Sequence, residues 1–192
     1  MTSELWDAEA TSFDDQPDHG LREPAVRAAW SDLLLPLLQP APAAVVDLGC
    51  GTGSLAVLLA RAGHVVQGVD FSPGMLAVAE EKAVGVEVDF RVGDVAEPPC
   101  PPGAYDVVLA RHVLWAMADP AAALSAWVRL LKPDGRLVLI EGRWFTGAGI
   151  AAEECRRLVL AHRKEATVTR LDDPALWGGP IEDERYVLVS RG

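Results

Sequence analysis

Residues 45–54 decide the fold of this chain, and they read Val45-Val46-Asp47-Leu48-Gly49-Cys50-Gly51-Thr52-Gly53-Ser54. An apolar run ends in an acid, and three glycines then alternate with small residues. The residues that follow show the i, i+3, i+4, i+7 apolar spacing of a helix: Leu55, Leu58, Leu59 and Ala62. The segment therefore predicts a strand, a tight glycine turn and a helix. In open α/β sheets this unit binds nucleotide cofactors, and the helix N-terminus favours a negative group.

The spacing of the glycines separates this turn from two other nucleotide-binding loops. A dinucleotide-binding fingerprint, G-x-G-x-x-G, would place its third glycine at position 54, where this chain has Ser54. A Walker loop needs a G-K-S/T sequence, and no lysine is near. The next apolar run ends at Asp70, 19 residues after Gly51. At about this distance such folds place a carboxylate that binds ribose hydroxyls.

Five motifs between residues 44 and 141 together resemble the class I S-adenosylmethionine-dependent methyltransferases. In chain order they are Asp47 to Gly53, Asp70-Phe71-Ser72-Pro73-Gly74-Met75-Leu76, Gly93-Asp94-Val95, Tyr105 to Leu109, and Leu131 to Leu139. The chain most resembles the small-molecule branch typified by ubiquinone and menaquinone biosynthetic methyltransferases. The resemblance implies an α/β fold: a doubly wound, Rossmann-like, seven-stranded and mostly parallel sheet, with a terminal antiparallel hairpin and helices on both faces.

The periodicity of the chain fits that fold. We expect strands over 44–49, 65–70, 86–92, 105–110 and 136–141, and a terminal pair over 166–171 and 186–190. Helices are expected over 52–62 and 150–164, after Ser72 and after Asp119. Another helix should start at Pro24 and kink or end at Pro36.

We expect one compact domain with two parts, a helical lid or substrate segment over 1–43 and a methyltransferase core over 44–192. Trp6 and Phe13 resemble the aromatic residues by which related methyltransferases cover the cofactor. The alternative is a terminus with two aromatic side chains on the surface.

Composition limits the classes of partner. The chain has 192 residues, 17 basic and 28 acidic, with a formal net charge of −11 and no basic cluster, which argues against nucleic acid. Three cysteines form no paired motif, which suits a reducing cytosol. The polar N-terminus and the short apolar runs indicate neither a signal peptide nor a membrane helix. We expect a cytoplasmic, bacterial protein that is a monomer or a homodimer and acts on a small molecule.

The resemblance implies binding of S-adenosylmethionine without a metal. Asp47 would orient the ammonium group, Asp70 the ribose hydroxyls, and Asp94 the adenine amino group. The full set of expected cofactor-binding residues is Asp47, Gly49, Cys50, Gly51, Gly53, Asp70, Phe71, Met75, Gly93, Asp94, Val95 and Arg111.

Residues near the end of the fourth strand are candidates for the chemistry. His112 is a candidate general base, because histidine titrates near neutral pH, and His19 is a weaker candidate. The expected substrate-binding residues are Phe13, His19, Trp30, His112, Trp115, Arg143 and Trp144. The expected function is methyl transfer to a small molecule by in-line displacement. A non-catalytic S-adenosylmethionine-binding regulator or partner subunit is the alternative.

Overall fold

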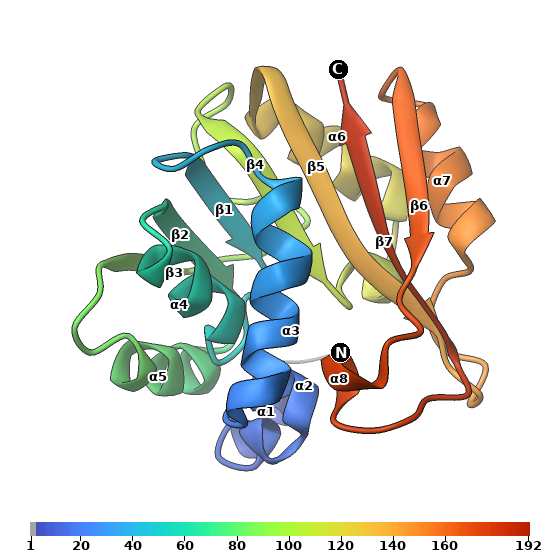
Figure 1. The fold of residues 1–192 in the computed structure, drawn as a ribbon. Coiled ribbons are helices and arrows are strands. Elements are labelled where there is room, and N and C mark those ends of the chain that lie inside the picture. Colours follow the sequence, from blue (N-terminus) through green and yellow to red (C-terminus); the bar gives the residue numbers. More distant parts are fainter. Residues whose placement is uncertain (1–2) are drawn as a thin grey trace.

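The computed structural model describes residues 3–192 and contains one seven-stranded sheet, in the order β3-β2-β1-β4-β5-β7-β6. The pairs from β3 to β5 are parallel, and β7 is antiparallel to both β5 and β6. This confirms the predicted sheet and its terminal hairpin (Figure 1). The strands are β1 Ala44–Leu48, β2 Val65–Asp70, β3 Val88–Val92, β4 Tyr105–Arg111, β5 Leu131–Arg143, β6 Glu165–Arg170 and β7 Glu184–Arg191.

Helices cover both faces of the sheet (Figure 1). The α-helices are α1 Ser3–Glu9, α2 Pro17–Gly20, α3 Pro24–Leu34, α4 Ser54–Arg61, α5 Pro73–Lys82, α6 Pro120–Leu130, α7 Ala152–Leu160 and α8 Pro174–Trp177. Short 3₁₀ turns are η1 Phe13–Asp15, η2 Leu35–Leu37 and η3 Leu114–Ala116. Helices α5 and α6 begin as the sequence predicts, because the side chains of Ser72 and Asp119 accept backbone N–H groups of the first turn and proline follows each cap.

Alternation along the strands produces two cores, one on each face of the sheet. Val46 and Val108 pack with α6 and α7, whereas Val45 and Val107 pack with α3, α4 and α8. Because consecutive strand residues point to opposite faces, a strand that is apolar at every position is buried on both sides. This explains the continuous apolar runs of the central strands.

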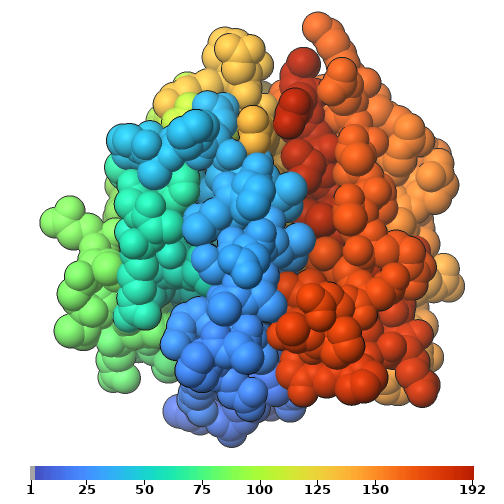
Figure 2. All heavy atoms as spheres, in the orientation of Figure 1, coloured from blue at the N-terminus to red at the C-terminus, as the bar shows by residue number. Residues whose placement is uncertain are grey.

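The N-terminal helices lie at the carboxyl ends of the parallel strands (Figure 1). The helices α3 and α2 contact α8, so the N-terminal helices lie side by side with a segment from near the end of the chain on one face (Figure 2). Trp30 of α3 and Trp177 of α8 form the centre of this contact, with ring centroids 5.5 Å apart in an edge-to-face arrangement. The sequence did not predict α8.

Several predicted boundaries are wrong in detail. The strand predicted over 136–141 is longer, since β5 runs from Leu131 to Arg143. Its register with β4 shifts near its start, where Tyr105 pairs with Leu131 but Val107 pairs with Arg136. Strand β3 begins at Val88, and α7 is shorter than the predicted 150–164. Pro36 does end the helix that starts at Pro24, as predicted. Among residues 3–192 no helix combines the length and apolarity that crossing a membrane requires.

Replacing Leu139 tests the buried centre of the sheet. Leu139 is fully buried on β5, so Leu139→Ala should lower the free energy of unfolding by about 2–5 kcal/mol. The matched variant Val65→Ala, on a strand residue that is 67% exposed, should change it by less than about 0.5 kcal/mol. Urea unfolding followed by circular dichroism measures both values. Equal losses in the two variants would contradict the assigned core.

Candidate active site

A cavity of about 720 Å³ lies at the carboxyl ends of the parallel strands. Its walls come from the glycine turn after β1, the ends of β2 and β4, the start of β7 and the N-terminal segment. In open α/β sheets ligands bind at this edge, beside the point where the strand order reverses. Strands β2 and β4 flank β1, so the glycine turn lies at that point.

Fifteen of the predicted site residues line this cavity. They are Phe13, His19, Asp47, Gly49, Cys50, Gly51, Asp70, Phe71, Met75, Asp94, Val95, Arg111, His112, Trp115 and Trp144. The structure therefore brings together segments that are far apart in the sequence. Their individual roles toward a cofactor or an acceptor stay predictions.

Four predicted site residues lie outside the cavity wall. Trp30 is fully buried in the core and donates its indole N–H to the Leu176 carbonyl at 2.8 Å. Arg143 is exposed at the end of β5. Gly53 and Gly93 are needed for packing, since a Cβ would lie 2.8 Å from Ala79 and 2.7 Å from Pro99 respectively. The sequence pattern could not separate these packing positions from ligand contacts.

The Asp70 carboxylate joins the end of β2 to the glycine turn. Its Oδ2 accepts the Gly51 N–H and its Oδ1 accepts the Ser72 N–H, both at 2.9 Å. Each oxygen keeps a second lone pair, so the same carboxylate can accept hydrogen bonds from a ligand. Burial raises the pKa of Asp70, against the lowering effect of these N–H donors.

The Asp47 carboxyl is buried at the base of the glycine turn. Burial raises its pKa to about 7, and the guanidinium of Arg111 opposes this shift. A buried carboxyl with so high a pKa becomes ionised when a cationic group binds beside it. The position therefore suits the ammonium end of a ligand.

His112 lies where β4 ends, in a backbone conformation that is rare for a residue other than glycine. Its φ is +58°, its N–H donates to the Ile140 carbonyl at 2.8 Å, and its own carbonyl accepts the Trp115 indole N–H at 2.9 Å. The imidazole Nε2 is buried and has no hydrogen-bond partner among residues 3–192. Burial, together with nearby Arg111 and Arg185, lowers the pKa of His112 well below its usual range. The imidazole is therefore neutral at pH 7, with Nε2 available.

Glu141 supports the loop that carries His112. Its Oε1 accepts the N–H groups of Val113 at 3.0 Å and Leu114 at 2.7 Å. Burial raises the pKa of Glu141 to about 8. Burial therefore favours the protonated form of this side chain.

Asp18, His19 and His112 form a cluster whose possible ligand atoms all lie within 4.8 Å of one another. Arg111 is partly buried beside this cluster and donates to the Asp18 carbonyl. Its positive charge disfavours a metal cation at this position. Absence of a metal in the reaction stays a prediction.

Two acidic side chains anchor the N-terminal segment, residues 3–20, to the rest of the protein. The first anchor is Asp7 of α1, which lies at the N-terminus of α5. Its Oδ1 accepts the Ser72 hydroxyl at 2.5 Å and the Gly74 N–H at 2.8 Å. These two bonds lower the pKa of Asp7. Phe13 then lies against Gly51, where a Cβ would be 3.5 Å from its ring, and stacks on His19 at a centroid distance of 4.3 Å. The segment thus forms one wall of the cavity over the glycine turn.

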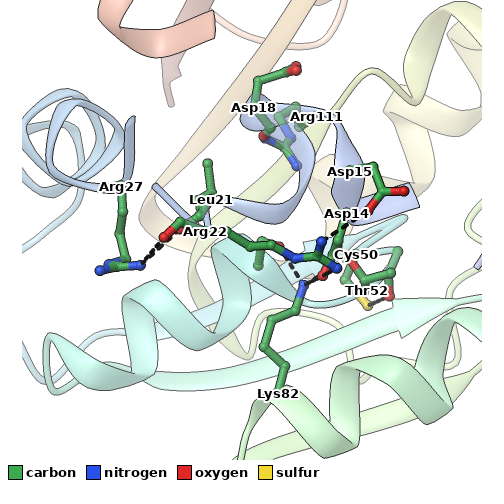
Figure 3. A network of polar contacts seen from close by, with 12 residues as sticks. Asp14, Asp15, Asp18, Leu21, Arg22, Arg27, Cys50, Thr52, Lys82 and Arg111 are labelled. Carbon is green, nitrogen blue, oxygen red and sulfur yellow. Dashed lines mark hydrogen bonds and ion pairs between the residues drawn. The ribbon is translucent and has the colours of Figure 1, made fainter. Parts of the chain in front are cut away.

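The second anchor is Asp14, which is 6% exposed. Figure 3 shows the polar contacts around it. It accepts the Thr52 hydroxyl at 2.5 Å and pairs with the Lys82 ammonium at 2.7 Å. Lys82 also donates to the Thr52 and Ser54 hydroxyls, at 3.0 and 2.7 Å. The network connects η1, the start of α4 and the end of α5.

Sequence reasoning did not assign several other wall residues to the site: Gln16, Asp18, Leu55, Val113, Ala116, Met117, Ala148 and Arg185. Most lie beside predicted residues. Arg185 does not lie beside a predicted site residue in the sequence. It belongs to the terminal hairpin, which the sequence motifs do not cover.

The variant Glu141→Gln tests whether the pKa of Glu141 is raised by burial in the folded protein. Because the pKa of Glu141 rises from 4.5 to about 8 on folding, the folded protein holds an extra proton between these values, and stability falls as the pH rises through them. Each pKa unit corresponds to about 1.4 kcal/mol. Glu141→Gln, which cannot ionise, should show a smaller loss of unfolding free energy between pH 5 and 8.5. Urea unfolding at several pH values measures this. The control Glu154→Gln, on the exposed side of α7, should behave as wild type, and equal pH slopes in all three proteins would exclude a buried Glu141 titration.

Asparagine at position 14 tests the second anchor. Asp14→Asn removes the charge that compensates the partly buried Lys82, so it should lower the free energy of unfolding by about 1–3 kcal/mol and speed proteolysis within residues 3–20. The control Asp15→Asn removes an exposed pair with Arg22 and should cost less than about 1 kcal/mol. Unchanged proteolysis in Asp14→Asn would mean that other contacts hold the segment.

Residues 46–139 match the family described as a methyltransferase domain. A demethylmenaquinone methyltransferase of Thermus thermophilus is 43% identical over 108 residues, which are 54% of this chain and 49% of that protein. A ubiquinone biosynthesis O-methyltransferase of Xanthomonas euvesicatoria pv. vesicatoria is 35% identical over 142 residues, 72% of this chain and 56% of that protein. The chain thus spans about half the length of the curated relatives it matches.

The fold also matches solved structures. The crystal structure of the cyclase SpnF superposes with a TM-score of 0.72 at 23% identity, covering 85% of this chain and 79% of SpnF. At that identity the match supports the fold and not the reaction. The matched domain, the order of the motifs and the sheet topology agree, and the chain belongs to the class I S-adenosylmethionine-dependent methyltransferase family.

Proposed function

We propose that this chain transfers a methyl group from S-adenosylmethionine to a small-molecule acceptor by in-line displacement. When bound, S-adenosylmethionine supplies a methyl group on a sulfonium, which a nucleophile attacks from the opposite side. The observation that carries the proposal is one cavity holding the glycine turn, Asp47 and Asp70 together with His112 and Trp115. The relatives named for menaquinone and ubiquinone biosynthesis support a small aromatic acceptor.

The residues of the β1 and β2 ends fit the cofactor. Gly49 and Gly51 have φ values of +69° and +53°, so a ligand can approach the backbone where a side chain would strain it. Asp47 would hold the ammonium group and Asp70 the ribose hydroxyls. The cavity wall next to Asp70 also contains the residues proposed for adenine, Phe71, Met75, Asp94 and Val95.

His112 is the proposed general base. Its neutral imidazole offers an unpartnered Nε2 in the cavity wall, so it can accept a proton from an acceptor hydroxyl as the new bond to carbon forms. His19 is the weaker candidate, since its ring is stacked on Phe13. Holding the acceptor in line and excluding water would supply the rest of the rate acceleration.

The alternative is a protein that binds S-adenosylmethionine without transferring methyl. SpnF, which shares the fold, is named a cyclase, so the fold alone does not decide the reaction. Detection of a methylated product separates the two functions.

Calorimetry with S-adenosylhomocysteine tests the cofactor site. The protein should bind S-adenosylhomocysteine and not NAD. Asp70→Ala should weaken binding by about 10- to 100-fold, because the ribose hydroxyls lose a charged acceptor. The control Asp89→Ala, an exposed acid of β3 paired with Arg91, should keep the wild-type affinity. Retained affinity in Asp70→Ala would contradict the ribose assignment.

Mass spectrometry of a panel of phenols, incubated with S-adenosylmethionine and the protein, tests the transfer itself. A gain of one methyl group supports the proposal. Binding of S-adenosylhomocysteine with no turnover of any acceptor favours the non-catalytic alternative.

A further inference from the structure

The cavity has a second end, whose composition differs from that of the cofactor end. The sheet order places β4, β5 and β7 on the side of β1 opposite to β2 and β3. The glycine turn and Asp70 follow β1 and β2, whereas Arg185 starts β7 and Trp144 follows β5. A cofactor held over β1 and β2 therefore leaves the β5–β7 end for the acceptor.

Arg185 is fixed in this end by aromatic rings and an acid. Its guanidinium carbon lies 5.2 Å from the Trp144 ring centre and 5.0 Å from that of Trp177. Its Nη2 donates to Asp183 Oδ2 at 2.9 Å, and the side chains of Arg185 and Asp183 are only 13% and 7% exposed. Two indole contacts and one ion pair hold the planar guanidinium in one place.

The neighbouring strand is shaped around this arginine. Gly142 of β5 pairs with Arg185 of β7, and a Cβ at Gly142 would lie 2.8 Å from Arg185 Cδ. The same Cβ would lie 2.5 Å from the Glu184 carbonyl oxygen, so glycine leaves room for both the partner backbone and the Arg185 side chain. The site therefore depends on Gly142 as well as on Arg185.

Arg185 has hydrogen-bonding capacity that the protein does not use. Nε is buried and has no acceptor among residues 3–192, while Asp183 engages Nη2. Buried donors are nearly always paired in proteins, so an unpaired one calls for a partner that the protein does not supply. A guanidinium fork matches the two oxygens of a carboxylate.

The other walls of this end are flat and aromatic. Trp115 and Trp144 line the cavity with ring centroids 5.3 Å apart, and His112 lies edge-to-face on Trp144 at 5.2 Å. Arg111 adds a second, partly buried positive charge in the wall, near the carboxyl groups of Asp18 and Asp47. Indole faces bind flat rings by stacking, and the two guanidinium groups favour an anion.

We propose that the acceptor is an aromatic carboxylate, with its ring against Trp115 and Trp144 and its carboxylate on Arg185. This proposal rests on the proposed function, because it assigns the acceptor of that same cavity. It gives Arg185 a role in acceptor selection. Such a ligand would also offset part of the positive charge that lowers the pKa of His112, and so make the imidazole a stronger base when the acceptor is bound.

Calorimetry on protein saturated with S-adenosylhomocysteine tests the proposal with the probes 2-naphthoate and 2-naphthamide. The two molecules have the same ring and nearly the same shape, but only the first is anionic. Wild type should bind 2-naphthoate at least about tenfold more tightly than the amide. Arg185→Gln should lose this preference while keeping its affinity for S-adenosylhomocysteine. The control Arg170→Gln removes an exposed arginine that also pairs with an acid two residues away, Asp172, and should keep the preference.

Loss of Arg185 leaves Asp183 buried without its partner, so the single variant could fail to fold. The double variant Arg185→Gln/Asp183→Asn removes both charges and should melt as one cooperative transition with the same loss of preference. Equal binding of the two probes by wild type, no binding of 2-naphthoate, or a preference that survives in the folded variant would each overturn the proposal. These outcomes are distinct from failure of the proposed function, in which S-adenosylhomocysteine would not bind or no acceptor of the panel would gain a methyl group.

Discussion

The two hydrogen bonds accepted by the Asp70 carboxylate are the constraint on which the site depends. They hold the Gly51 N–H and the Ser72 N–H at 2.9 Å on either side of one carboxylate, so the ends of β1 and β2 stay a fixed distance apart. Ser72 in turn caps α5 and donates its hydroxyl to Asp7. The position of the N-terminal segment thus follows from the carboxylate that also faces the cavity. Loss of Asp70 would disturb the turn, the helix start and the covering segment together.

The cavity contains two guanidinium groups although the protein as a whole is strongly acidic. Carboxyl groups lie at the β1–β2 end, where burial raises the pKa of Asp47 to about 7. Arg111, near Asp18, and Arg185, paired with Asp183, lie toward β4 and β7, and together with burial, the larger cause, they lower the pKa of His112. At a distance of a few ångströms, and beside protein walls of lower dielectric constant than water, such charges favour ligands of opposite sign. A cationic cofactor and an anionic acceptor would satisfy the two ends, and their opposite charges would draw them together in the reacting orientation.

The sequence predicted those parts of the fold in which the interacting residues are close together in the chain. The glycine turn, the acid that ends β2 and the Ser72-Pro73 helix start all depend on residues within a few positions of one another. Trp30 is different, because an apolar helix position gives no sign of whether its ring faces a cavity or, as here, the core contact with α8. Arg185 is different as well, since its importance comes from the register that places it opposite Gly142. Such pairings arise only from the folded sheet.

The backbone at His112 explains how an imidazole can be positioned while one nitrogen stays free. A φ of +58° costs a residue with a side chain about 1–3 kcal/mol, so the surroundings must enforce it. They do so through the Ile140 carbonyl, the Trp115 indole and the Glu141 side chain, which holds the two N–H groups that follow His112. Because these contacts fix the main chain, no side-chain hydrogen bond to Nε2 is needed to hold the ring. Burial lowers the pKa of His112 most and Arg111 and Arg185 lower it further, so an anion bound beside these arginines would raise the basicity of the imidazole.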